Sequence, residues 1–161
     1  MISFKILSKI KQKFAGSPVS ELRDGEGTLL PTTLNLMVTD ACNSRCVMCN
    51  VWDSKQEKEF TPSELSEILK DPLFENLKSI GVSGGEPTLR RDLPELFQVL
   101  AGKKGIRGIS LITNALNESA AISQLDRCNG ICKEAGVSFS VMVSLDGIGS
   151  VHDSVRGRKG S

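Results

Sequence analysis

Short strand-like segments alternate with helical segments from residue 32 onward, and this alternation restricts the fold more than any other feature of the chain. The strand-like segments are rich in β-branched and apolar residues and cover 32–38, 77–83, 108–114 and 137–147. The helical segments carry apolar residues three or four positions apart and cover 60–70, 91–103 and 118–135. Strands that alternate with helices of this length form βαβ units with parallel strands, so the sequence predicts an α/β fold.

Two of the helical segments begin with clear start signals. Thr61 precedes Pro62 and is followed by Glu64, the pattern of a capping box with proline at the first helical position. We expect Asp92 and Glu95 to repeat this cap at the next helix. These signals fix where each buried helical face begins.

Unusual residues follow each strand-like segment. A loop with three cysteines follows the first, Gly-Gly-Glu-Pro follows the second, Thr-Asn-Ala follows the third, and Ser-Leu-Asp-Gly closes the fourth. The carboxyl ends of parallel strands meet at one edge of a sheet, where α/β proteins bind their ligands. We therefore predict a single functional site built from these four loops.

The loop after the first strand holds Cys42, Cys46 and Cys49, whereas Cys128 and Cys132 lie far along the chain. Three thiolates around four irons leave one iron without a protein ligand, and a catalytic metal site needs such an open position. A small chelating molecule would complete it. Five cysteines, three of them crowded together, do not suggest a disulfide framework, so we expect reduced thiols in a reducing compartment.

Other uses of the three cysteines remain open at this point. Zinc could take them with His152, the only histidine, although that residue lies in a different predicted loop. Cys46 and Cys49 could form a redox pair of the C-x-x-C kind, which would leave Cys42 without a role. Purely structural thiols would be unusual among so many polar neighbours.

The segment 84–87, Gly-Gly-Glu-Pro, follows the second strand. Glycine has no Cβ and lets the backbone approach a ligand closely. Exposed carbonyl oxygens and the Glu86 carboxylate would then form a pocket that only accepts hydrogen bonds, which suits an ammonium group. Pro87 would stiffen the turn.

The segments CNSRCVMC and SGGEPTLRRDL resemble the two signature motifs of the radical S-adenosylmethionine superfamily, in the expected order and on successive strand–helix units. The resemblance covers most of the chain, from residue 33 to residue 157. It implies a partial (βα)6 TIM-like barrel of radical SAM type, of which this chain holds only the first four units. It also implies two cofactors, a [4Fe–4S] cluster and S-adenosylmethionine.

Under this resemblance the three cysteines hold the cluster, and S-adenosylmethionine binds the fourth iron through its amino and carboxylate groups. An electron from the cluster cleaves the sulfonium C–S bond and releases a 5′-deoxyadenosyl radical, which abstracts a hydrogen atom from a substrate. The protein's own part is to position the reactants and exclude water. We expect an electron donor such as flavodoxin or ferredoxin, and a cytoplasmic location that suits an oxygen-sensitive cluster.

The same resemblance supplies the residues around S-adenosylmethionine. Gly84, Gly85 and Glu86 would hold its amino group. Met48 would contact the adenine, and Ser144 would hydrogen-bond the cofactor. The remaining residues of the predicted cofactor site are Pro87, Asn114, Asp146 and Arg156.

Two clusters of residues have uses that the sequence leaves open. Arg156 could meet a carboxylate of the cofactor or the substrate, or Asp146 and Arg156 could only pin the loop after the fourth strand. Cys128 and Cys132 could bind an auxiliary cluster. Because they lie on the apolar face of the helix over 118–135, we expect them to pack in the core instead.

Within the superfamily, the chain is similar to enzymes that carry SPASM or twitch extensions and to the molybdenum-cofactor cyclase. The first similarity implies a peptide, a protein or a small molecule as the substrate. The cyclase has substrate-binding arginines where this chain has Asn35 and Gly81. A triphosphate would lack its charged partners here, so we do not expect that substrate.

We divide the chain into a basic leader helix with a linker, 1–31, and a core, 32–161, that we expect to be truncated at its C-terminus. The isolated chain would then bind its cofactors weakly and turn over no substrate. The alternative is a non-catalytic iron–sulfur or S-adenosylmethionine-binding module, or an inactive remnant. For residues 1–14 we favour a solvated or docked helix over contact with a membrane surface. The net charge of +1 creates no field that would gather nucleic acid.

Overall fold

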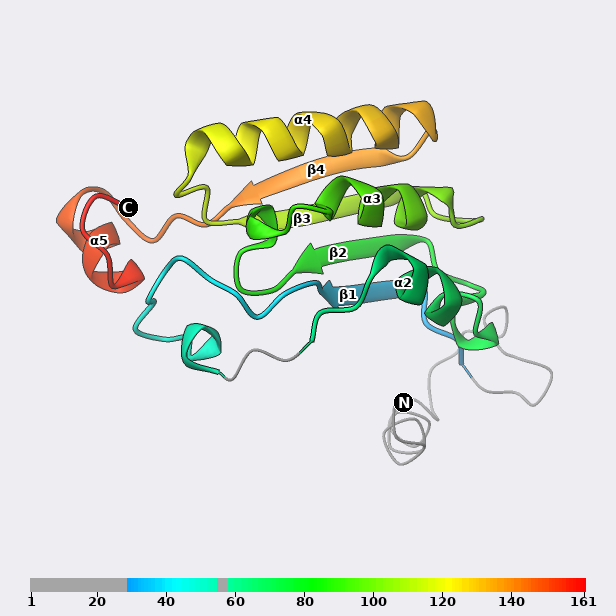
Figure 1. The fold of residues 1–161 in the computed structure, drawn as a ribbon, viewed down its shortest axis with the longest axis horizontal. Coiled ribbons are helices and arrows are strands. Elements are labelled where there is room, and N and C mark those ends of the chain that lie inside the picture. The colour runs from blue at the N-terminus through cyan, green and yellow to red at the C-terminus, as the bar shows by residue number, and fades with distance from the viewer. Residues whose placement is uncertain (1–28, 55–57) are drawn as a thin grey trace.

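The computed structural model describes residues 29–54 and 58–161, and a parallel sheet forms its centre (Figure 1). The strands are β1 (Thr33–Met37), β2 (Ser79–Ser83), β3 (Gly108–Thr113) and β4 (Ser138–Val143). Their order across the sheet is β1-β2-β3-β4, and every neighbouring pair is parallel. The predicted α/β fold with four strands is therefore confirmed, and the chain adds each new strand beside the previous one.

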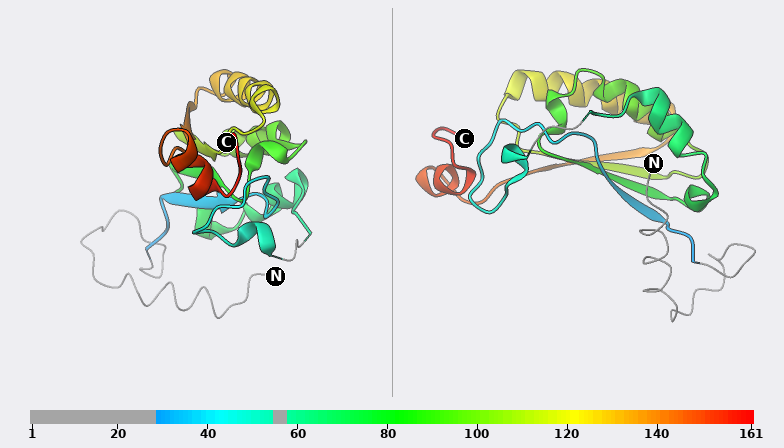
Figure 2. Two further views of the ribbon diagram at one scale, coloured as in Figure 1. Left: turned by 90° about the vertical axis from the view of Figure 1, so that its left-hand side faces the viewer. Right: turned by 60° about the horizontal axis from the view of Figure 1, so that its bottom comes forward.

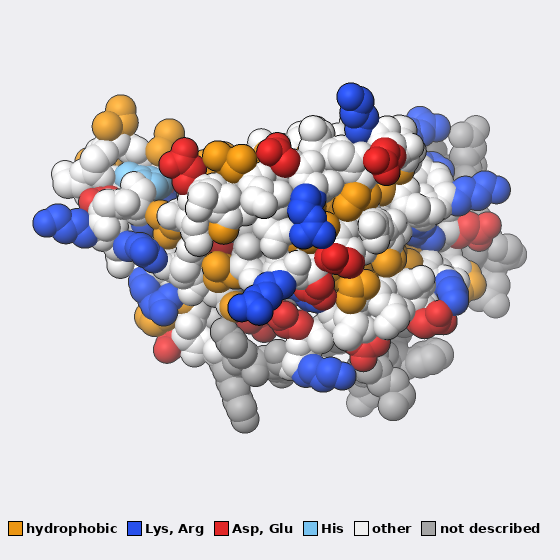
Figure 3. All heavy atoms as spheres, turned by 45° about the horizontal axis from the view of Figure 1, so that its top comes forward, with side chains coloured by type: hydrophobic (Ala, Val, Ile, Leu, Met, Phe, Trp, Pro, Cys, Tyr) orange, Lys and Arg blue, Asp and Glu red, His pale blue; other side chains and the backbone are white. Residues whose placement is uncertain are grey.

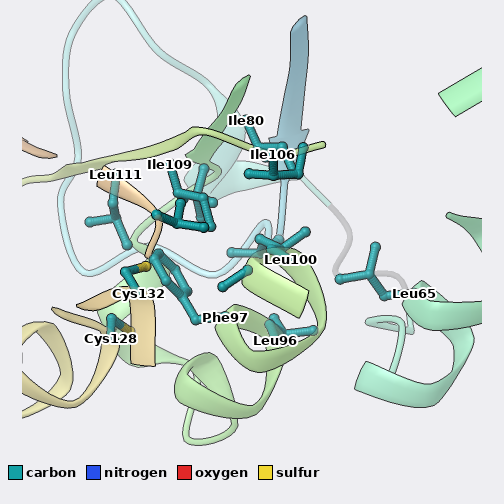
Figure 4. Close-up of a cluster of buried hydrophobic side chains, with 14 of the residues drawn as sticks. Leu65, Ile80, Leu96, Phe97, Leu100, Ile106, Ile109, Leu111, Cys128 and Cys132 are labelled. Atoms are coloured by element: carbon teal, nitrogen blue, oxygen red, sulfur yellow. The ribbon is translucent and has the colours of Figure 1, made fainter. Parts of the chain in front are cut away.

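Three helices cover one face of the sheet, as Figure 2 shows: α2 (Pro62–Ile68), α3 (Leu93–Gly102) and α4 (Glu118–Glu134). The core lies between these helices and the inward side chains of the strands (Figure 4). Phe97 of α3 meets Phe139 of β4 edge to face, with ring centroids 5.3 Å apart. Cys128 and Cys132 are free thiols buried in this core, so the expectation that they pack as small apolar side chains is confirmed.

The two predicted helix starts have different outcomes. At α2, the Thr61 hydroxyl accepts from the amide of Glu64 and the Glu64 carboxylate accepts from the amide of Thr61, which confirms the capping box. At α3 the predicted cap is wrong, because the Asp92 side chain makes no capping bond. Its carboxylate instead accepts from Nε and Nη2 of Arg90, at 2.9 and 2.7 Å. The Asp92 carboxylate therefore binds the nearby charged guanidinium group instead of the free amide groups at the start of α3.

A short helix, α5 (Ser150–Arg156), follows β4 and was not predicted from the sequence. It begins after Gly149 and ends at Gly157, and both glycines have a positive φ. Glycine in this conformation commonly stops a helix. Figure 1 shows α5 at the end of the sheet toward which the strand arrows point.

The predicted leader helix and most of its linker fall on residues 1–28, which lie outside the described residues. Among the helices that the structure describes, none is long and apolar enough to cross a bilayer. Acidic and basic side chains are interspersed over the face shown in Figure 3, in keeping with the balanced charge of the whole sequence.

Candidate functional site

A cavity of about 300 Å3 lies where the four strands end, and all four of the following loops contribute to it. Most of the predicted site residues line it: Cys42, Cys46, Met48, Cys49, Gly84, Gly85, Glu86, Asn114, Ser144 and Arg156. Pro87 and Asp146 do not, since Pro87 begins the buried turn η3 (Pro87–Leu89) and Asp146 pairs with Arg156. Two larger hollows, of about 620 and 490 Å3, lie beside α2 and contain none of the predicted residues.

The three thiols face this cavity from one loop, with Cys46 nearly buried and Cys42 and Cys49 half-buried. Burial is the main reason that the pKa of the Cys42 thiol is raised, and the negative charges of Glu86 and the other two thiols add to it. In the part of the chain that the structure describes, no three His, Cys, Asp or Glu side chains lie close enough to hold a single metal ion.

The cysteine loop, 39–49, lies directly against the glycine turn that follows β2. The amide of Gly85 donates to the carbonyl of Thr39 at 2.7 Å, and the amide of Glu86 donates to the carbonyl of Ala41 at 2.8 Å. A Cβ on Gly84 would stand 2.4 Å from the Thr39 oxygen, and one on Gly85 would stand 2.2 Å from the Ala41 oxygen. The two glycines therefore allow the backbone of the cysteine loop to lie close to this turn. From the sequence we had expected them to allow the close approach of a ligand.

Glu86 belongs to the wall of the cavity, but its carboxylate is occupied by protein donors, contrary to our expectation of a free acceptor. It is 1% exposed and accepts four hydrogen bonds. The donors are the amide and hydroxyl of Thr88, the hydroxyl of Thr113 and the amide of Asn114, at 2.6–3.1 Å. Glu86 thus ties the end of β3 to the glycine turn. Among the described residues, no donor reaches the carbonyl oxygens of Gly84 or Gly85, and both residues line the cavity.

Asn114 joins the third loop to the first. Its Nδ2 donates to Oδ1 of Asn43 at 2.8 Å and lies 3.9 Å from Sγ of Cys42. Its Oδ1 accepts from the amide of Leu116, which fixes the turn after β3. Ser144 is positioned next to it, because its amide donates to the Thr113 carbonyl at 2.9 Å.

Helix α5 covers the cysteine loop from the other side. Its last carbonyl groups accept from the loop: Arg156 O from the amide of Arg45 at 3.0 Å, and Val155 O from the amide of Val47 at 2.9 Å. The hydroxyl of Ser44 also donates to Arg156 O, at 3.0 Å. Carbonyl groups that a helix end leaves unpaired are thus satisfied by the loop that carries the cysteines.

Arg156 and Asp146 form an ion pair, with Nε and Oδ2 2.6 Å apart. The pinning role that the sequence left open is therefore observed, while Arg156 still lines the cavity. His152 is 7% exposed, and its Nδ1 accepts from the amide of Asp146 at 3.1 Å. That nitrogen therefore takes part in holding the loop after β4.

The sequence reading missed residues that organise the site without carrying its chemistry. They are Asn43, Ser44, Arg45, Thr88, Thr113 and Gly157. Gly157 had a usable signal, because a glycine directly after a basic residue is typical of a helix end. The others are common polar residues whose partners lie far away in the sequence.

Comparisons with known proteins agree with this geometry. The model of the Radical SAM superfamily matches residues 36–161. Fe-coproporphyrin III synthase of Methanosarcina barkeri is 38% identical over 129 residues, which cover 77% of this chain and 29% of the relative. A probable GTP 3′,8-cyclase of Methanococcus vannielii is 34% identical over 116 residues, covering 71% of this chain and 36% of the relative.

A solved structure gives the same architecture. SuiB of Streptococcus suis bound to S-adenosylmethionine superimposes with a TM-score of 0.63 at 18% identity, covering 82% of this chain and 29% of that one. The likeness supports a partial radical SAM barrel as the fold. The chain spans 29% and 36% of the length of the two curated relatives.

Proposed function

Because this chain belongs to the radical SAM superfamily, we propose that it holds a [4Fe–4S] cluster through Cys42, Cys46 and Cys49 and binds S-adenosylmethionine in the adjoining cavity. These are the cofactors of the family. The observation that carries the proposal is the meeting of the three cysteines with Gly84 and Gly85 around one cavity.

When bound, the two cofactors supply the reductive cleavage of S-adenosylmethionine to a 5′-deoxyadenosyl radical for hydrogen abstraction. The chain's own residues prepare the cavity for them. The carbonyl oxygens of Gly84 and Gly85 would accept from the amino group, because the Glu86 carboxylate is already occupied by protein donors. Met48 and Ser144 would contact the adenosyl part, and the apolar side chains of Val51 and Ile112 would exclude water.

We do not assign the substrates of the relatives to this chain. One relative's name specifies coproporphyrin and the other's specifies GTP. Our chain matches only about a third of each relative, and two enzymes with different substrates have this part in common. Asn35 and Gly81 lie side by side on β1 and β2 without a positive charge, which does not suit a triphosphate. We propose a peptide, a protein or a small molecule as the substrate class, and flavodoxin or ferredoxin as the electron donor.

Anaerobic reconstitution tests the proposal. The chain, treated with iron and sulfide, should take up four irons and show the electron paramagnetic resonance of a reduced cubane, as the family's cluster requires. Dithionite and S-adenosylmethionine should then yield 5′-deoxyadenosine, measured by chromatography. A stable cluster without cleavage would support the non-catalytic module instead.

Cysteine variants give the matched control. Replacing Cys42, Cys46 or Cys49 by alanine should abolish the cluster. Cys128→Ala should keep it, because that thiol is buried in the core. Iron uptake that survives in the first three variants would refute the proposed site.

A further inference from the structure

The guanidinium group of Arg156 lies against a predicted cluster ligand. Its Nη1 is 3.6 Å from Sγ of Cys46, within hydrogen-bonding reach of sulfur. The Arg156 side chain is largely buried, so water competes little for this contact. A hydrogen bond from a charged donor is stronger than a neutral one.

Two kinds of contact hold Arg156, an ion pair at its guanidinium group and hydrogen bonds at its backbone carbonyl. Its Nε lies 2.6 Å from Oδ2 of Asp146, and the amide of Asp146 is bonded to His152. The backbone carbonyl of Arg156 accepts from Arg45 and Ser44 in the cysteine loop. The donor and the sulfur therefore belong to one connected set of contacts.

Ser44 is the other polar group near this sulfur, with its hydroxyl oxygen 3.2 Å from Sγ of Cys46. Its single proton can go either to this sulfur or to the carbonyl of Arg156, which lies 3.0 Å away, so two acceptors compete for one donor. In the thiolate form, which binds metal, Cys46 has no proton to give to Ser44. Arg156 is then the charged side chain that donates to the sulfur.

Hydrogen bonds to the ligand sulfurs are among the factors that set the potential of an iron–sulfur cluster. An added electron increases the negative charge on the sulfurs, so a donor stabilises the reduced form more than the oxidised form. Asp146 offsets the net charge of Arg156. The effect of Arg156 on the sulfur therefore comes from the local N–H group and not from a long-range electrostatic field.

We propose that Arg156 is a positioning residue that raises the reduction potential of the cluster by donating to Cys46, and that Asp146 aims it. This proposal rests on the proposed function, since it needs the cluster. It gives the segment after β4 a part in electron uptake that is separate from any contact with substrate.

The test is a redox titration of the reconstituted chain, followed by electron paramagnetic resonance without S-adenosylmethionine. Arg156→Met should make the cluster harder to reduce by about a factor of ten, which is about 59 mV for a one-electron couple. Arg156→Lys keeps a charged N–H donor and should lie between Arg156→Met and the wild type.

Arg158→Met is the matched control. The Nη1 of Arg158 also bonds to the cysteine loop, but to the carbonyl oxygen of Asn43 at 2.9 Å and not to a sulfur. Its removal weakens the loop without removing a donor to the cluster, so the potential should stay at the wild-type value. A merely structural role for Arg156 would move both variants alike.

Each outcome decides the matter. Equal potentials in Arg156→Met and the wild type, both with a full cluster, would overturn the proposal. If Arg156→Met takes up no iron, Arg156→Lys decides: a potential below the wild type supports the proposal and an equal one overturns it, with Arg158→Lys as its control. Failure of the wild type to form any cluster is a different result, which refutes the proposed function itself.

Discussion

The carbonyl oxygen of Arg45 lies in the space that a side chain at position 157 would need. A Cβ added to Gly157 would stand 2.0 Å from this oxygen, and the φ of Gly157 is +62°. The close approach brings the end of α5 onto the cysteine loop, where the amide of Arg45 donates to Arg156 O. Any other residue at 157 would separate the two segments.

Gly157→Ala should therefore lower the iron content of the reconstituted chain severalfold. Two effects act together, a left-handed conformation that costs alanine about 1 kcal/mol and the clash with Arg45. Gly136→Ala is the control, because Gly136 follows the end of α4 with a φ of +67° but has no atom within 4 Å of an added Cβ. Equal iron content in the two variants would contradict the importance of this contact.

Glu86→Gln should lower the free energy of unfolding by about 2–4 kcal/mol, measured with urea. The glutamine has one acceptor oxygen where the carboxylate had two, and a hydrogen bond to a buried charged group contributes about 1.5–3 kcal/mol. Glu95→Gln is the control, since the partner of Glu95 within the described part of the chain is Arg127, in an exposed ion pair. A loss below about 0.5 kcal/mol in Glu86→Gln would show that the four donors find other partners.

Arg90→Met should cost about 3 kcal/mol or more, because it removes a buried charge with several partners. The Arg90 side chain is 3% exposed and donates to the carbonyls of Val38 and Phe60 as well as to Asp92. Its hydrogen bonds to Asp92 also hold the pKa of that carboxyl below its usual value. In the wild type, this lowered pKa contributes stability that is present above about pH 4 and is lost as the pH falls below it. The variant should lack this contribution, so its stability should depend less on pH in that range.

The control for Arg90→Met is Arg127→Met, which breaks only the surface pair with Glu95. That change should alter the free energy of unfolding by less than about 0.5 kcal/mol. If the two arginine variants unfold at the same urea concentration, the buried network around Arg90 does not stabilise the fold as we infer.

Stability should fall above pH 9 because of the thiol of Cys128. Burial raises its pKa to about 12, so the thiol stays neutral in the folded chain while it ionises near pH 9 in the unfolded one. The unfolded state then binds fewer protons, and stability declines between pH 9 and 12 by up to about 1.4 kcal/mol per pH unit. Urea unfolding at pH 7.5, 9 and 10 measures this decline. Cys128→Ala should make the decline shallower without removing it, because burial also raises the pKa of Cys132. Equal slopes in the variant and the wild type would contradict the assignment.

The sequence was sufficient for the sheet and for the gathering of the site. Local patterns place the strands, and the rule that parallel strands end at one edge brings Cys42, Gly84, Asn114 and Ser144 to one cavity without knowledge of any contact. The capping box at Thr61 was also predictable, because both of its members lie within four residues.

The parts that failed depend on contacts between distant residues. The pattern at Asp92 suggested a cap, but the nearby guanidinium of Arg90 competes for the same carboxylate. From the sequence, the carboxylate of Glu86 was expected to be free to bind a ligand. In the structure it accepts a hydrogen bond from Thr113 of β3, which lies 27 positions further along the chain. Helix α5 has few apolar positions of its own, and it is its contact with the cysteine loop that gives it a place in the fold.

The bond between Ser44 and the carbonyl of Arg156 spans 112 positions of the sequence. A ribosome that adds about 5–20 residues per second needs roughly 6 to 22 s to cover that distance. During this time the nascent chain presents three uncovered thiols to its surroundings. Iron carriers, oxidants and other thiols would all compete for them before translation reaches the residues that shelter Cys46.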